Sequence, residues 1–228
     1  MKNIDDLKKR IAEELQGYNI YFSPESVPES IEFPVAWRNF GFVDGKSSRI
    51  PDTWDLFAER LPWVTSWLDK CVLGTFLAVS DKPYLLYVYC EDDELNFYIG
   101  GVPIEGDGVW SGKLAYLNGD LKQFYRTLHD GFGFYIGCTM GPSRAEDFVW
   151  IEDLCDEAIP SLPTLVGFFS SGAGDYLAVE LKSSADEAYI WWHEKPEFPD
   201  KNINMWDVMD AWMSIFLENS DSNEIMYV

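Results

Sequence analysis

The chain contains two histidines, His129 and His193, the side chains best suited to proton transfer or metal binding near neutral pH. A zinc site needs three or four ligands, and the sequence offers no clear third ligand to accompany the two histidines. Either histidine could act as a general base or a metal ligand, or could hydrogen bond within the structure. We favour the structural role and expect no metal.

Paired carboxylates such as Glu91 with Asp92, or Glu152 with Asp153, could supply a catalytic acid and base. The chain has 39 acidic residues, however, so such pairs are expected by chance. It lacks the GxSxG, HExxH and P-loop motifs. The segment GFGFYIG at 131–137 is glycine-rich but lacks the GxGxxG spacing of a nucleotide loop. We therefore expect a protein that is not an enzyme, with no catalytic residue and no cofactor.

The four cysteines, Cys71, Cys90, Cys138 and Cys155, include no close pair typical of a zinc or redox motif. Free thiols in a reducing compartment are the simplest interpretation. Residues 1–16 lack the apolar run of a signal peptide, and no later stretch holds 18 uncharged apolar residues. These features predict a cytoplasmic protein without a membrane span.

Acidic residues outnumber basic ones by 39 to 17, which gives a formal net charge of -22. The imbalance is strongest from Trp150 onward, where 16 acidic residues face 3 basic ones. Such a field repels nucleic acid and anionic membranes and accelerates encounter with basic proteins. The alternative is that the acidic surface merely keeps an aromatic-rich chain in solution.

The first half predicts a helix, a loop and an antiparallel meander. Apolar spacing indicates a helix over 4–15, with Asn3 as its cap, followed by a proline-rich loop and a short helix over 53–60 that Pro62 ends. Strands are expected at 72–79, 84–90 and 95–99. The glycine-rich connector 100–108 suggests a boundary between an amino-terminal region, 1–108, either an extension or part of the same domain, and a core, 109–228.

The second half predicts a helix over 121–128 that stops at Gly131 and Gly133, and a buried strand at 165–169. A hairpin follows, with strands at 175–181 and 188–192, in which Leu177 and Val179 share a face and Trp191 and Trp192 point to opposite faces. The closing helix, 204–217, has Asn204 as its cap. Its expected apolar face comprises Met205, Val208, Met209, Trp212, Ile215 and Phe216.

Several of these elements occur in an order that resembles the SUKH superfamily, which is best known for bacterial immunity proteins. They are the helix ending at Gly133, Gly174 and Asp175 before an apolar strand, the cluster Trp191, His193 and Glu194, and a final helix. The resemblance covers roughly the carboxy-terminal half. It implies an α+β fold with a mainly antiparallel twisted sheet, helices packed on the sheet, and a SUKH-like core at 109–228.

The resemblance also implies a function, which is to bind and block a cognate toxin, a nuclease or another basic enzyme, without catalysis. We expect partner contacts at two acidic clusters and at an aromatic position, namely Glu91, Asp92, Asp93, Glu94, Glu152, Asp153, Asp156, Glu157, Trp192 and Glu194. An intracellular scaffold or regulatory adaptor of the same fold is the alternative, and a hydrolase using acidic residues is the third possibility. No nucleic-acid or membrane partner is expected, and the sequence leaves the oligomeric state open.

Overall fold

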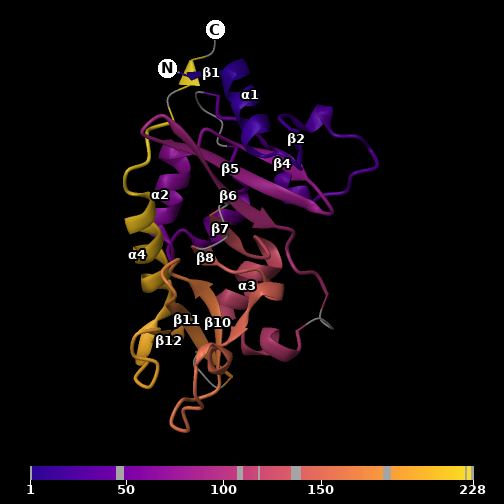
Figure 1. Ribbon diagram of the computed structural model, residues 1–228. Coiled ribbons are helices and arrows are strands. Elements are labelled where there is room, and N and C mark those ends of the chain that lie inside the picture. The colour runs from indigo at the N-terminus through magenta and orange to yellow at the C-terminus, as the bar shows by residue number, and fades with distance from the viewer. Residues whose placement is uncertain are drawn as a thin grey trace. The chain divides into compact units, whose positions relative to one another are not determined.

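The computed structural model describes residues 2–44, 49–106, 110–117, 119–134, 140–181, 186–223 and 225–226. Cys138 and the end of the glycine-rich segment 131–137 lie outside these ranges. The chain forms two compact units, the first made of 1–102 with 216–228 and the second of 103–215 (Figure 1). The α+β class predicted from the sequence is confirmed. Within the described ranges no helix is long and apolar enough to cross a bilayer.

The two units differ from the sequence-based division at the carboxyl end of the chain. The first unit ends at Val102, inside the predicted connector, but residues 216–228 pack with it and not with the core to which we assigned them. A short parallel pair joins the two termini, β1 (Lys2–Asn3) with β14 (Ile225–Met226). The chain therefore passes between the units twice, and the second passage gives no glycine-rich signal.

The sheet of the first unit is built on the predicted meander. Strands β4 (Gly74–Val79), β5 (Pro83–Glu91) and β6 (Glu94–Gly101) pair antiparallel in sequence order. The outer edge of β4 pairs with two short strands from the proline-rich region, β2 (Asn19–Tyr21) and β3 (Gly41–Phe42). Seven consecutive residues of β5, 84–90, are buried, so both faces of this strand are covered.

The helices of the first unit confirm one prediction and correct another. Helix α1 (Ile4–Glu14) begins at Asn3, whose side chain accepts hydrogen bonds from the Asp5 and Asp6 amides. The predicted helix 53–60 is a 3-10 helix, η3 (Asp52–Phe57). Pro62 starts a new helix, α2 (Pro62–Cys71), because proline suits the first helical turn. Two further 3-10 turns are η1 (Pro24–Ser26) and η2 (Val35–Trp37).

The second unit is built on the predicted hairpin and its neighbours. The order of its sheet is β13 (Asp200–Asn204), β12 (Glu187–Trp191), β11 (Tyr176–Glu180), β10 (Leu165–Ser170) and β8 (Gly141–Pro142), all antiparallel, with β9 (Val149–Trp150) also paired to β10. Edge strand β13 was not predicted. Before the sheet come α3 (Gly119–Thr127), as expected, and β7 (Phe132–Phe134). Three 3-10 turns are η5 (Gly112–Tyr116), η6 (Ala145–Asp147) and η7 (Ile151–Leu154).

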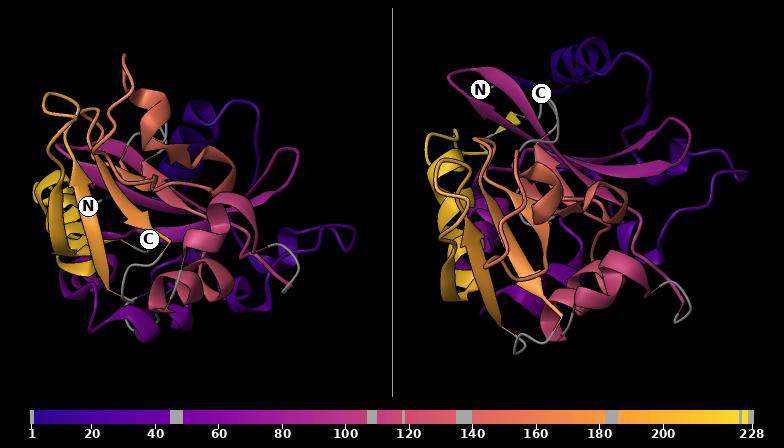
Figure 2. Two further views of the ribbon diagram at one scale, coloured as in Figure 1. Left: turned by 90° about the horizontal axis from the view of Figure 1, so that it is seen from below. Right: turned by 60° about the horizontal axis from the view of Figure 1, so that its bottom comes forward.

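The two faces of this sheet are covered by different segments. On one face, Trp191 packs in a cluster with Ile151, Leu165 and Ala178, so η7 lies over this side. On the other face, Phe169 of β10 contacts Trp212 of the closing helix α4 (Met205–Leu217), with ring centroids 5.8 Å apart. Figures 1 and 2 show α4, drawn in yellow, running beside β11 and β12. Trp191 and Trp192 therefore belong to opposite faces, as predicted.

Helix α4 begins as predicted, but its buried face coincides only in part with the expected one. The Asn204 side chain accepts hydrogen bonds from the Trp206 and Asp207 amides, which confirms the cap. The buried residues of its first turns are Met205, Trp206, Met209 and Met213, whereas Ile215 is 67% exposed and Val208 and Trp212 are half-buried. The expected face was therefore correct for Met205 and Met209 and wrong for Ile215. Only Asp207, Asp210 and Ser214 are polar in this helix, so apolar spacing does not fix the helix phase.

Leu177 provides a direct test of this sheet, because its side chain is fully buried in β11. Leu177→Asp places an unpaired carboxylate in the core and should lower the free energy of unfolding by about 2–5 kcal/mol. The matched control is Leu181→Asp, just beyond the same strand, where the side chain is 53% exposed. Urea unfolding of both variants provides the measurement, and an unchanged midpoint for Leu177→Asp would refute the strand assignment.

Candidate functional site

The turn before β11 is fastened to the end of β12 by Asp175. Its Oδ1 accepts a hydrogen bond from the His193 amide at 3.1 Å and lies 2.7 Å from His193 Nδ1. Ser171 braces the same turn, since its hydroxyl accepts hydrogen bonds from the Ala173 and Asp175 amides. Gly174 has a φ of +99°, and a Cβ there would lie 3.2 Å from His193 Nδ1. The glycine is therefore required by backbone conformation and by space.

We call the contact between the turn at Asp175 and the end of β12 the Asp175–His193 corner. It gives His193 a structural role, because the Nδ1 atom and the backbone amide of His193 both interact with the Asp175 carboxylate. The other histidine, His129, is fully buried and stacks on Phe132 with ring centroids 5.9 Å apart. Among the residues that the structure describes, no three His, Cys, Asp or Glu side chains gather as a metal site would require.

Immediately beside this corner, Trp192 reaches the surface on the α4 face of the sheet. Its ring is half-buried and lies against Trp212, with centroids 6.4 Å apart and planes inclined by 58°. Trp212 in turn packs on buried Phe169. One helical turn along α4, Ile215 is exposed. The aromatic contacts thus run from the core to a surface that is apolar and partly accessible to solvent.

The loop that joins β12 to β13 fixes the other side of this surface. The Trp192 indole N–H donates a hydrogen bond of 2.8 Å to Asp200 Oδ2, which ties the two ends of the loop. Between them, two turn hydrogen bonds order the chain, and Phe198 is 75% exposed. Glu194 is exposed on the same loop. We name Trp192, Asp200, Trp212 and Ile215 the tryptophan surface.

The acidic segment 152–157 lies on the opposite face of the sheet, where η7 covers Trp191. Glu152, Asp153, Asp156 and Glu157 are all exposed, beside Leu154, which is 40% exposed. Burial, together with the charges of Asp156, Glu197 and Glu152, raises the pKa of the Cys155 thiol. Since Glu197 belongs to the β12–β13 loop, the negative field of the segment continues onto that loop. The raised pKa also makes Cys155 a poor nucleophile.

The second predicted cluster, Glu91 to Glu94, forms the tip of the β5–β6 hairpin in the first unit. Asp92 and Asp93 have φ values of 50° and 66°, which a tight two-residue hairpin turn requires and which aspartate tolerates. Arg10 of α1 donates a hydrogen bond of 2.9 Å to the Asp93 carbonyl. The turn geometry and this contact explain why aspartates stand at the hairpin tip. The acidic residues of segment 152–157 have no such structural explanation.

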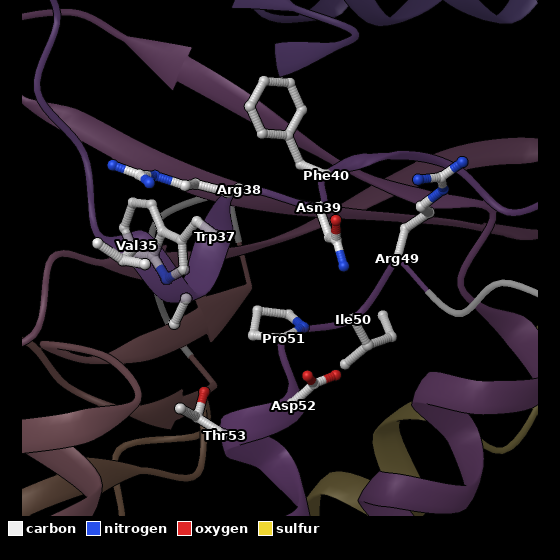
Figure 3. Close-up of a pocket in the computed structure, with 11 residues that line it drawn as sticks. Val35, Trp37, Arg38, Asn39, Phe40, Arg49, Ile50, Pro51, Asp52 and Thr53 are labelled. Atoms are coloured by element: carbon white, nitrogen blue, oxygen red, sulfur yellow. The ribbon is translucent and has the colours of Figure 1, made fainter.

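The first unit also contains a pocket of about 450 Å³ beside η2 and η3, which the sequence did not predict (Figure 3). Arg38 and Arg49 lie on its rim and extend in opposite directions, with Asp52 between their segments (Figure 3). Arg49 is held by Asp44 at 2.6 Å and by the Phe42 carbonyl at 3.2 Å. The charged groups therefore do not converge on one point, as binding of a small ligand would require. The pocket is lined by residues 35–40 and 49–53.

Comparison with known proteins found no matching family model, curated protein or solved structure. A function can therefore be inferred only from the surfaces just described. The structure joins one predicted contact residue, Trp192, to Trp212 and Asp200, which sequence reasoning did not select. The signal for Asp200 was weak, since its distance from Trp192 depends on how the intervening loop closes.

The Asp175–His193 corner can be tested by a double-mutant cycle. Asp175→Ala removes the acceptor for the His193 amide and should lower the free energy of unfolding by about 1–2 kcal/mol. His193→Ala keeps the amide contact and should cost less, with a coupling of about 0.5–1 kcal/mol because the imidazole is partly exposed. Chemical denaturation measures all three variants. Asp156→Ala, on the exposed segment, is the control, and an effect of Asp175→Ala no larger than this control would contradict the account.

Proposed function

We propose that this chain is an immunity protein, which binds a cognate bacterial toxin and neutralises it by occlusion without catalysis. The toxin would be a nuclease or another enzyme with a basic surface. The observation that carries this proposal is the tryptophan surface, which presents accessible aromatic and apolar side chains beside the carboxylate of Asp200, within the most acidic third of the chain. Aromatic anchors surrounded by polar groups are the usual core of a protein–protein interface.

The charge distribution supports a basic partner in two ways. First, the negative field around 152–157 and the β12–β13 loop would accelerate encounter with a positively charged protein. Second, carboxylates can occupy positions that substrate phosphates would take on a nuclease. The resemblance to the SUKH superfamily in the second unit points in the same direction and remains part of the proposal. A cytoplasmic location would follow from this function, because the toxin acts after it enters the cell.

The alternative function is an intracellular scaffold or regulatory adaptor, which would use the same surface for a partner other than a toxin. The two functions differ in what neighbours the gene. An immunity protein requires a toxin domain encoded beside it, and co-expression should protect bacteria from that domain. Absence of such a neighbour would contradict the immunity function and favour the adaptor.

The electrostatic part of the proposal predicts which acidic cluster guides association. Neutralising two charges of the exposed segment, with Glu152→Gln and Asp156→Asn, should slow association with the toxin domain by about 3- to 10-fold at low salt and flatten its salt dependence. The matched control removes two charges from the hairpin tip, with Asp92→Asn and Asp93→Asn, because asparagine also tolerates the required φ. Stopped-flow fluorescence at low and high salt provides the rates. Equal slowing by the two pairs would show that association responds to the net charge and not to the exposed segment in particular, and no effect of either would refute electrostatic guidance.

A further inference from the structure

We propose that the tryptophan surface receives an arginine side chain of the partner, with the guanidinium on the Trp192 indole and Asp200 as its counter-ion. This inference specifies the chemistry of the proposed interface and so rests on the proposed function for its biological meaning. The binding chemistry itself depends only on residues of the second unit, and it can be tested without the toxin.

The environment of Trp192 leaves part of its ring available. Trp212 contacts one side, and Asp200 accepts a hydrogen bond from the indole N–H, so a carboxylate lies at the ring edge. Asp200 is exposed. Among the described residues, its side chain makes a hydrogen bond only to the Trp192 indole. A cation that approached the accessible part of the ring would therefore meet an aromatic surface and a negative charge together.

Another indole of the same unit shows what an occupied ring looks like. Trp110 has Lys122 Nζ at 4.7 Å and Arg126 Cζ at 5.7 Å from its ring centroid, both from α3. In the part of the chain that the structure describes, no lysine or arginine lies over Trp192. The chain thus supplies its own cations to Trp110, whereas Trp192 has the carboxylate but no cation.

Arginine fits this arrangement better than lysine. Its planar guanidinium stacks on an aromatic ring and still presents N–H donors at its edge, where Asp200 can accept them. It is also more weakly hydrated than an ammonium group, so it loses less on leaving water. Exposed Ile215, one helical turn from Trp212, would contact the apolar part of the same side chain or of adjacent partner residues.

The experiment titrates the complete chain, labelled with ¹⁵N, with N-acetyl-arginine amide and follows the assigned tryptophan indole N–H signals by NMR. The Trp192 signal should shift progressively, and the Trp110 signal should not. N-acetyl-citrulline amide, which has nearly the same shape without the charge, is the matched control probe and should shift Trp192 at least 3-fold less. N-acetyl-lysine amide should also be weaker than arginine.

Asp200→Asn keeps an acceptor for the indole but removes the charge, and it should reduce the arginine response of Trp192 about 2- to 5-fold. Asp207→Asn, an exposed residue in the first turn of α4, should leave the response unchanged. Equal shifts with arginine and citrulline, or an Asp200→Asn response equal to that of the parent, would overturn the proposal, and a stronger response to lysine would overturn the guanidinium assignment. If arginine binds at Trp192 but the chain fails to protect against the toxin, the proposed function is wrong and the binding chemistry stands.

Discussion

The second unit depends on one constraint, the alternation of side chains at the end of β12. Trp191 and Trp192 are consecutive, so a strand must send them to opposite faces of the sheet. Trp191 fills the cluster beneath η7, and Trp192 leaves the sheet toward α4, where it contacts Trp212. A shift of register by one residue would exchange the two, exposing the core residue and burying the anchor. The candidate interface and the core are therefore fixed by the same register.

The Asp175 corner holds that register in place. Gly174 adopts a left-handed φ and leaves room for the His193 ring, and Asp175 then binds both the amide and the imidazole of His193. Since His193 directly follows Trp192, the corner fixes the strand end that presents the indole. Gly174, Asp175 and His193, which carried part of the family resemblance, thus fix the end of the hairpin.

The sequence was sufficient for the elements that local patterns specify. The hairpin, the meander and the Asn3 and Asn204 caps follow from alternation, β-branched content and capping chemistry. Prediction from the sequence failed where one pattern is compatible with two structures. Pro62 can end a helix or begin one, and here it begins α2. Strand β13 has little β-propensity, and Asn202 within it has a φ of 56°, so its pairing comes from the neighbouring strand.

The candidate site was predictable only in part, for the same reason. Strand alternation identified Trp192, but the phase of α4 decides that Trp212 packs between Phe169 and Trp192 and that Ile215 is exposed. A helix with three polar residues does not reveal its phase. Asp200 approaches Trp192 only through the closure of the intervening loop, to which turn hydrogen bonds within the loop contribute. The acidic clusters were visible from composition, yet only their geometry separates the tight turn at Asp92 and Asp93 from the exposed segment 152–157.

In the function proposed above, a partner binds at the tryptophan surface. Hydrogen–deuterium exchange of the chain, alone and in complex with the toxin domain encoded beside it, measures whether this surface becomes protected. We expect slower exchange on binding in the β12–β13 loop, residues 192–200, and in the second half of α4. Protection confined to other segments, such as the pocket lining at 35–40 and 49–53, with unchanged exchange at 192–200, would contradict this proposal.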